Sequence, residues 1–578
     1  MTAREIDDWV ADAALQHWGV TLILSFVLSF PLTYVITAIS SSLQSQSEDE
    51  NREPPINPYS IPFLGSWFSF LLAPKSLVDG VIRRFGHKGP VTIRLGPQKA
   101  YLLTRPEEYG TILKATRSLT NKAVMVMVME QIFGSPPSAR HVYRNDKSGV
   151  SAVPLPGSTV PDKLRVWHHQ HKTSARFLQG ENLRNMTTRI IDHLSAELAK
   201  TTPGDPIDSG DWVQLDDFYT WYVHKFFAAS TAAIFGEHIL KLNEGFVEDF
   251  WEYMECWPTY SKMYPKVFAQ RAFAARQRVL DGIKKWHRFA RQHSDYRKNG
   301  PEHPDWDEYW GSSWLKVRQQ WGIDTGCMDD DALASEDLAI MTAASANALP
   351  MAFWNLLEVF RDSSLLVKVR EEIAGTIIRD NDAANPDTPQ LPLRFSIEAL
   401  TSGPTLQSVY AEVLRMRVSI MLNRSPVDGD YQLGPYRLEH GAYVFISTNV
   451  AHEHEAGWAA RTDNGRRPLS EFWAERFLVP DDKNKKGKTE ANGEKKFSTD
   501  GLDGAWIPYG GGALMCPGRH LAKKEMMGGV AVFAAYFDLE LLGDTLPKMN
   551  HGFYGLGAQP PAEPTPVRIR RRLGVVGK

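Results

Sequence analysis

The chain has 578 residues and a formal net charge of −3 at pH 7, with 43% hydrophobic residues and 17 tryptophans. This apolar fraction supports a large buried core and excludes an intrinsically disordered chain. The small net charge gives no reason to expect nucleic acid as a partner. The three cysteines are too few and too scattered for a disulfide framework or a Cys-x-x-Cys zinc site, which favours a reducing compartment.

An apolar segment near the N-terminus is long enough to cross a membrane. Residues 18–39 are almost all apolar, and no charged side chain lies between Asp12 and Glu48. About twenty helical residues span the hydrocarbon core of a bilayer. A cleaved signal peptide normally has a basic start and a shorter apolar core, so an anchor is favoured. We predict an N-terminal tail over residues 1–17 and a transmembrane anchor over residues 18–40.

A polar segment follows the anchor, and a proline-rich segment follows that. Prolines 54, 55, 58 and 62 stiffen the second part into an extended spacer. We therefore predict a linker over residues 41–62. No linker interrupts the remainder, so residues 63–578 are predicted to form one domain.

The rest of the chain is patterned mainly for helices. Two short β regions are expected, at residues 91–95 and 443–446. Residues 264–298 predict a long basic amphipathic helix. Its apolar stripe consists of Phe268, Ala272, Ala275, Val279, Ile283, Trp286 and Ala290. The predicted fold class is mainly α with small β-sheets.

The segment from Met341 to Trp354 is a predicted helix that contains Ala346, Asn347 and Pro350. Pro350 has no N–H, so the carbonyl four residues earlier, at Ala346, loses its helical partner. This opens a polar notch beside Asn347. Two interpretations follow: Asn347 acts on a ligand there, or it merely caps the freed carbonyl.

Glu412 and Arg415 lie three residues apart in an apolar-periodic segment and share a helix face. By itself such a pair is usually a solvated surface pair. Arg476, followed by Phe477, comes later in the chain. The cluster at residues 452–455 lacks His-Glu-x-x-His spacing and is predicted to be a polar turn. The charged stretch at residues 481–496 is predicted to be a solvated loop.

A glycine-rich loop carries Cys516. Gly510, Gly511 and Gly512 precede it, and a helix-like run begins at His520. Glycines let the backbone approach a flat cofactor, and a helix start favours thiolate over thiol. The alternative is an inert, buried cysteine. No nicotinamide-binding glycine motif is present, so electrons would have to come from another protein.

Glu412-x-x-Arg415, then Arg476-Phe477, then the glycine-rich loop of Cys516 resemble the signature of the cytochrome P450 family. The resemblance covers nearly the whole chain and implies the cytochrome P450 fold for the body. It also implies haem b, iron protoporphyrin IX, with Cys516 as its axial thiolate ligand. A buried network of Glu412, Arg415 and Arg476 would brace the haem-binding core.

The family usually has an acid and an alcohol where this chain has Ala346 and Asn347. That pair followed by proline, with Cys516-Pro517-Gly518-Arg519, is similar to the branch of steroid 7α- and 12α-hydroxylases and prostacyclin synthase. Leu514 stands where many members have a propionate-binding arginine. The resemblance makes these residues candidate cofactor contacts: Trp167, His171, Arg424, Gly510, Gly512 and Gly518. Pro517 cannot donate to the sulfur, which leaves Gly518 and later amides to do so.

The resemblance implies a membrane-anchored monooxygenase that oxidises a bulky lipophilic substrate, such as a steroid, triterpenoid or other terpenoid. Electrons would come from NADPH-cytochrome P450 reductase, with the anchor in the endoplasmic reticulum membrane and the catalytic domain in the cytosol. Two alternatives stay open: a haem-thiolate isomerase that needs no reductase, and a non-catalytic haem- or ligand-binding protein. The candidate substrate-pocket residues are Ala343, Ala344, Met421, Phe553 and Leu556, with Asn347 and Ala346 as the catalytic candidates.

Overall fold

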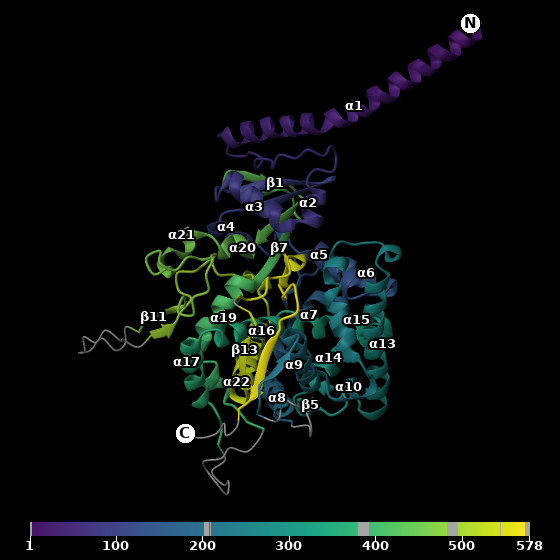
Figure 1. The fold of residues 1–578 in the computed structure, drawn as a ribbon. Helices are drawn as coiled ribbons and strands as arrows, with labels where there is room; N and C mark the ends of the chain where they lie inside the picture. The colour runs from purple at the N-terminus through teal and green to yellow at the C-terminus, as the bar shows by residue number, and fades with distance from the viewer. Residues whose placement is uncertain are drawn as a thin grey trace. The chain divides into compact units, whose positions relative to one another are not determined.

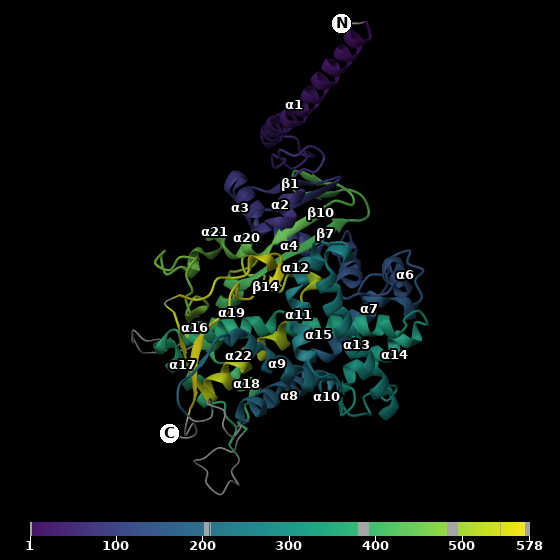
Figure 2. The same ribbon diagram turned by 45° about the vertical axis from the view of Figure 1, so that its right-hand side comes forward.

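The computed structural model describes residues 3–200, 207, 210–379, 392–481, 495–543 and 545–572, with side chains from Trp18 onward. Residue contacts divide the chain into two compact units, residues 1–121 with 421–450, and residues 122–420 with 451–578. The fold is mainly helical with small sheets, which confirms the predicted class (Figures 1 and 2).

The first unit contains a small mixed sheet. β1 (Pro90–Leu95) pairs antiparallel with β2 (Gln98–Leu103), and β2 pairs parallel with β10 (Tyr443–Ser447). β10 in turn pairs antiparallel with β7 (Val418–Pro426), which runs on from the second unit. β1 and β10 confirm the two predicted β regions. The other elements of this unit are α1 (Ala3–Gln46), α2 (Trp67–Leu72), α3 (Pro74–Phe85), α4 (Pro106–Lys114), β3 (Leu119–Thr120), β8 (Tyr431–Leu433) and β9 (Tyr436–Leu438).

α1 is one continuous helix that includes the predicted anchor (Figure 1). From Val20 to Gln46 it is long and apolar enough to cross a membrane, judged by length and composition. It continues past residue 40 because its C-terminal part is tied to the following segment. Thr37 Oγ1 donates to the carbonyl of Tyr59 at 3.2 Å, and the amide of Ile56 donates to Gln44 Oε1 at 2.9 Å. The predicted linker therefore starts too early.

The proline-rich segment lies along β1 instead of forming a free spacer. The amide of Thr92 donates to the carbonyl of Pro55, and the amide of Asn57 donates to the carbonyl of Thr92, both at 2.8 Å. Pro54 and Pro55 are buried. An extended segment at a sheet edge suits the fixed φ of proline, whose missing N–H is not needed there. The spacer prediction is wrong for these residues, which belong to the folded body.

The second unit is a bundle of helices. α16 (Ala348–Phe360) packs against α9 (Phe218–Phe235) and α22 (Arg519–Tyr536), and α8 (Gly180–Ala199) lies beside α9 and α22 (Figure 2). The remaining elements in this unit with defined bounds are α5 (Lys122–Met127), α6 (Pro137–Asn145), α7 (Val166–Phe177), β4 (Val213–Leu215), α10 (His238–Leu242), α11 (Phe246–Glu255), α12 (Trp257–Ser261), α13 (Gln270–His293), β5 (Trp306–Asp307), β6 (Gly311–Ser312), α14 (Ser313–Asp324), α15 (Asp330–Ser345), α17 (Ser363–Ala374), α18 (Ile397–Leu400), α19 (Pro404–Arg417), α21 (Glu455–Trp458), β11 (Leu478–Pro480), β12 (Lys495–Phe497), β13 (Phe537–Leu541), β14 (Leu556–Ala558) and β15 (Val567–Arg571). α20 (Thr448–His452) spans the boundary between the units.

Two glycines let α22 approach its neighbours closely. A Cβ on Gly528 would lie 2.3 Å from the Cδ1 atom of Ile191, and one on Gly529 would lie 2.5 Å from the hydroxyl oxygen of Tyr222. Both distances are below the contact distance of heavy atoms, so neither site accepts a larger residue without a shift. This packing holds α22, and with it the loop that precedes α22, against the bundle.

Two further predictions are corrected in the second unit. α13 starts at Gln270, and Phe268 lies before it with 80% of its surface exposed, so Phe268 is not part of the stripe. The other six stripe residues are buried as predicted. In the stretch predicted as a solvated loop, residues 482–494 lie outside the described residues, and residues 495–496 belong to β12, which pairs with β11.

Candidate functional site

Cys516 ends a tight loop just before α22. Gly510 and Gly512 have φ values of +70° and +66°, a conformation that favours glycine. The amide of Cys516 donates to the carbonyl of Tyr509 at 3.0 Å and closes the loop. Because α22 begins at Arg519, the free amides of its first turn lie next to the sulfur.

The surroundings of Cys516 shift the pKa of its thiol in opposite directions. Burial raises the pKa of the Cys516 thiol, whereas hydrogen bonds from the amides of Gly518 and Arg519 lower it. Pro517 has no amide proton, so the donors come from the two residues after it, as the sequence predicts. The other two cysteines lie elsewhere: Cys256 is buried after α11, and Cys327 is half-buried after α14.

Glu412, Arg415 and Arg476 form a buried network. Arg415 Nε donates to Glu412 Oε2 at 2.7 Å, and Arg476 Nε donates to Glu412 Oε1 at 2.8 Å. All three residues are no more than 2% exposed. The other nitrogens of Arg476 donate to the backbone carbonyls of residues 461, 467, 468 and 471. A buried charge needs this degree of pairing, so the network is a rigid support and not a solvated surface pair.

His452 connects this network to the cysteine loop. Its Nδ1 lies 3.0 Å from the carbonyl of Arg415, and its Nε2 accepts from the amide of Ile507 at 3.2 Å. The prediction of a polar turn at residues 452–455 is wrong for His452, which is fully buried at the end of α20. Burial, with the charge of Arg415, lowers its pKa to about 3, so the ring is neutral. The apolar residues Val450 and Ala451 just before it are the one sequence signal that this histidine faces inward.

The predicted central helix is broken into two. α15 ends at Ser345 and α16 starts at Ala348, so Ala346 and Asn347 lie at the break. Pro350 therefore falls in the first turn of α16, where its missing N–H costs no helical hydrogen bond. The predicted cause of the notch, a proline inside a continuous helix, is therefore wrong, because the helix is interrupted at Ala346 and Asn347 before Pro350 is reached.

Asn347 does not cap the carbonyl freed at the break. Its Oδ1 accepts from the amide of Ala558 on β14 at 2.8 Å. A Cβ on Gly557 would lie 2.2 Å from that same oxygen, so glycine is required for the approach. Gly557 and Ala558 are site residues that sequence reasoning missed, because the contact joins segments far apart in the chain.

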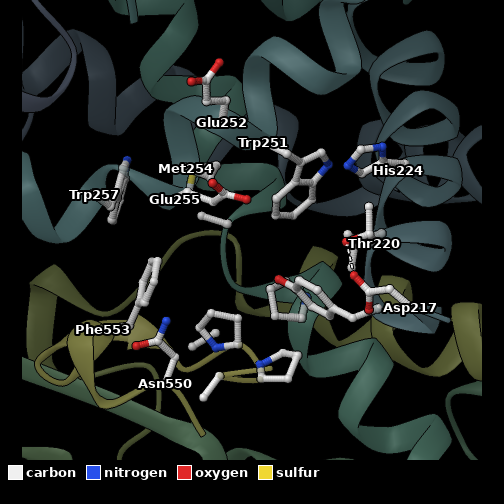
Figure 3. A pocket seen from close by; sticks show the side chains of 18 of the residues that line it. Asp217, Thr220, His224, Trp251, Glu252, Met254, Glu255, Trp257, Asn550 and Phe553 are labelled. Carbon is white, nitrogen blue, oxygen red and sulfur yellow. Dashed lines mark hydrogen bonds between the residues drawn. The ribbon is translucent and has the colours of Figure 1, made fainter. Parts of the chain in front are cut away.

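A cavity of about 720 Å³ opens beside the break (Figure 3). Aromatic side chains from α9, α11 and the turn before β14 line it, including Tyr219, Trp251 and Phe553. Of the predicted pocket and catalytic residues, Phe553, Leu556, Ala346 and Asn347 line this cavity. Ala343 and Ala344 are not among its lining residues, and Met421 lies in the first unit.

Comparison with known families identifies the chain. The sequence model of the family described as Cytochrome P450 matches residues 54–564. The chain belongs to the cytochrome P450 family. The match begins at the proline-rich segment that lies along β1 and includes the network, the break and the cysteine loop.

Curated relatives include fungal and vertebrate cytochromes P450. Cytochrome P450 monooxygenase efuG of Hormonema carpetanum is 34% identical over 527 residues, which cover 90% of each chain. Cytochrome P450 monooxygenase fsoE of Humicola fuscoatra is 31% identical over 534 residues, 90% of this chain and 88% of that one. The human 7-alpha-hydroxycholest-4-en-3-one 12-alpha-hydroxylase is 25% identical over 543 residues, 90% of this chain and 93% of that one. This cytochrome P450 is therefore an oxidoreductase of the monooxygenase class, related to steroid hydroxylases.

Cytochromes P450 use haem ligated by a cysteine thiolate, and the donors present here fit that group. Trp167 Nε1 is buried and has no hydrogen-bond partner within the described residues. His171 lies one turn further along α7, and burial lowers its pKa. In the first unit, Arg424 Nη1 donates to the carbonyl of Asn423, while its buried Nε is unpaired among the described atoms. An unpaired N–H group such as that of Trp167 would suit the carboxylate of a haem propionate.

Proposed function

We propose that this cytochrome P450 is a membrane-anchored monooxygenase whose substrate is a bulky lipophilic molecule, namely a steroid, a triterpenoid or another terpenoid. The observation that carries the substrate class is the aromatic-lined cavity of about 720 Å³ that reaches Asn347. Small-molecule pockets typically have volumes of roughly 300–1,000 Å³. The relative whose name states a steroid substrate supports the same class.

Cys516 is proposed as the axial ligand of the haem iron. When haem is bound, it supplies oxygen activation, to which an anionic sulfur ligand contributes electron density. The chain holds the sulfur in place through the loop at Gly510 and Gly512 and through the amide of Gly518. His452 and the buried Glu412 network keep that loop in register with α19.

Ala346 and Asn347 stand where the family usually has an acid and an alcohol. Ala346 has no proton to transfer, so proton delivery at this position would fall to Asn347 and ordered water. Its Oδ1 is held by the amide of Ala558, which fixes the orientation of the carboxamide. The bond from Ala558 is the one hydrogen bond of this carboxamide among the described residues, so Nδ2 is available to donate to an ordered water.

Electrons are proposed to come from NADPH-cytochrome P450 reductase, with α1 anchoring the protein in the endoplasmic reticulum membrane and the catalytic body in the cytosol. The apolar helix Val20–Gln46 supports the anchor. The first turns of α22 carry Arg519, His520, Lys523 and Lys524, which supports docking of an acidic electron donor beside Cys516.

The test uses full-length, haem-loaded protein with reductase, NADPH and ¹⁸O₂ on a panel of sterols and terpenoids. We expect a product that carries one ¹⁸O atom. Cys516→Ala should lose the far red-shifted Soret band of the ferrous carbon monoxide complex, whereas Cys256→Ala and Cys327→Ala should keep it. Full conversion without oxygen or reductase would select an isomerase instead, and tight binding without any conversion would select a carrier.

A further inference from the structure

Two aromatic side chains with ring nitrogens line one side of the cavity beside the helix break. Trp251 and His224 lie together on one side, across from Asn550 and Phe553 (Figure 3). The two rings are stacked, with planes 11° apart and centroids 6.3 Å apart. Trp251 comes from α11 and His224 from α9, so this polar pair joins two helices in the cavity wall.

Trp251 holds an unused hydrogen-bond donor in the wall. The residue is 8% exposed, and its Nε1 is buried without a hydrogen-bond partner among the described residues. Figure 3 shows the indole nitrogen on the side that faces His224. Leaving a buried donor unpaired costs about 1–3 kcal/mol, so an acceptor supplied by a ligand is expected.

His224 supplies the complementary group. Burial lowers the pKa of its imidazole, while Glu248, Asp217 and Glu255 act in the opposite direction. A neutral imidazole has one N–H donor and one acceptor nitrogen. An oxygen that accepts from the indole N–H and donates to the imidazole nitrogen satisfies both rings, and a hydroxyl group does both.

The rim of the cavity selects against anions. Five carboxylates line it, those of Asp217, Glu248, Glu252, Glu255 and Glu563. The one basic side chain among the lining residues, Arg271, is already paired with Glu252 at 2.8 Å and Glu255 at 3.0 Å. A substrate carboxylate entering here meets like charges, whereas a neutral hydroxyl does not.

We propose that the substrate is a neutral polycyclic alcohol whose hydroxyl group is held by Trp251 Nε1 and His224, with its carbon skeleton along Tyr219 and Phe553. This inference rests on the proposed function and adds the polar group that the substrate carries. Because Asn347 lines the same cavity, the held hydroxyl orients the skeleton and determines which carbon is presented at the helix break.

The experiment measures affinity with two probe series that differ at a single position. The first is 5α-cholestan-3β-ol, 5α-cholestane and 5α-cholestane-3β-carboxylic acid, and the second is the equivalent set on a pentacyclic triterpene. Binding to full-length, haem-loaded protein in detergent micelles is measured by calorimetry. We expect each alcohol to bind about tenfold more tightly than its hydrocarbon. This difference in affinity corresponds to about 1.4 kcal/mol for one hydrogen-bonded group. The acid should bind more weakly than the alcohol.

Two variants locate the effect. Trp251→Phe keeps an aromatic ring and removes the N–H, so it should weaken binding of the alcohol about tenfold and leave the hydrocarbon unchanged. Trp321→Phe is the matched control, because Trp321 is also 8% exposed with an unpaired Nε1 but does not line the cavity. It should change neither affinity. His224→Phe should repeat the loss seen with Trp251→Phe.

Equal affinity for alcohol and hydrocarbon, no binding of either in both series, or equal effects of Trp251→Phe and Trp321→Phe would overturn the proposal. These outcomes are read from affinities. Failure of the proposed function is read separately, from the absence of ¹⁸O-labelled product with wild-type protein over the whole substrate panel.

Discussion

Two regions of the molecule differ in how their polar groups are paired. One is the group of residues that supports the cysteine loop, here called the support, and the other is the helix break with its cavity. The support consists of Glu412, Arg415, Arg476 and His452, all of them buried, and none of the buried side-chain atoms without a partner belongs to them. The helix break contains Ala346 and Asn347, and the cavity beside it includes the buried Nε1 donor of Trp251, which has no partner among the described residues. Complete pairing gives a rigid holder, whereas incomplete pairing leaves groups for a ligand.

The largest effect is expected from removing the charge at the centre of the support. Glu412→Gln keeps the shape of the side chain but leaves Arg415 and Arg476 buried without a carboxylate. Breaking a buried ion pair from one side costs about 3–5 kcal/mol. We expect loss of most folded, haem-loaded protein, measured by thermal unfolding and by haem content after purification.

Glu475→Gln provides the control for that experiment. Glu475 also accepts from two cations, Lys368 and Lys495, but it is partly exposed. Exposed pairs contribute about 0–1 kcal/mol, so this variant should purify with normal haem content. Similar losses in both variants would show that burial of the network is not what makes it important.

The second prediction concerns the pH dependence of stability through His452. Its pKa is lowered to about 3 in the folded protein, against about 6.5 in an unfolded chain. Between these values the unfolded chain binds more protons, so stability falls as pH decreases below about 6.5. This one group should remove about 2 kcal/mol between pH 7.5 and pH 5.

His452→Leu isolates this contribution. The variant leaves the amide of Ile507 and the carbonyl of Arg415 without their partner, at a cost of about 1–3 kcal/mol for each at pH 7.5. Denaturant unfolding at the two pH values should then show a smaller loss on acidification than in the wild type. Parallel losses in both proteins would contradict a neutral, buried His452.

The third prediction concerns the helix break. Asn347→Ala removes the acceptor for the amide of Ala558 and the free Nδ2 donor, so it should lower stability by only about 1 kcal/mol. The amount of product formed per NADPH consumed should fall severalfold. Asn550→Ala is the comparison, since Asn550 lines the same cavity but binds the amide of Gly552. Equal amounts of product per NADPH in the two variants would show that Asn347 does not take part in the reaction.

The smallest effect is expected at the surface of α22. Lys523 is held by Gln407 Oε1 at 2.6 Å, which leaves Lys524 as the better candidate for docking a reductase. Lys524→Glu should slow reductase-supported turnover about twofold to fivefold at low salt, less at high salt, because exposed charges are screened. Peroxide-supported turnover should stay the same. A matching loss by the peroxide route would reject docking at this position.

The family resemblance was enough to predict the network of Glu412, Arg415 and Arg476, because the order of the motifs along the chain carries that resemblance. His452 was misjudged for the opposite reason: its partners lie in α19 and in the cysteine loop, far from it in the chain. The apolar N-terminal helix was predicted from its composition, but its C-terminal end was not, since contacts of Thr37 and Gln44 with the next segment decide where the helix stops. The proline content of residues 54–62 suggested a free spacer. In the structure, backbone hydrogen bonds to β1 make this segment part of the sheet edge.

By itself, the sequence determined the family, the helical class, the cysteine candidate for the iron and the unusual Ala346-Asn347 pair, because each is encoded in neighbouring residues or in overall composition. The tertiary structure alone decided that the central helix breaks at that pair, that Asn347 turns to Ala558, and that Trp251 and His224 meet in one cavity. These contacts join α9, α11, α16 and the C-terminal strands. Partners so distant along the chain leave no periodic pattern, since their pairing depends on how the helices pack.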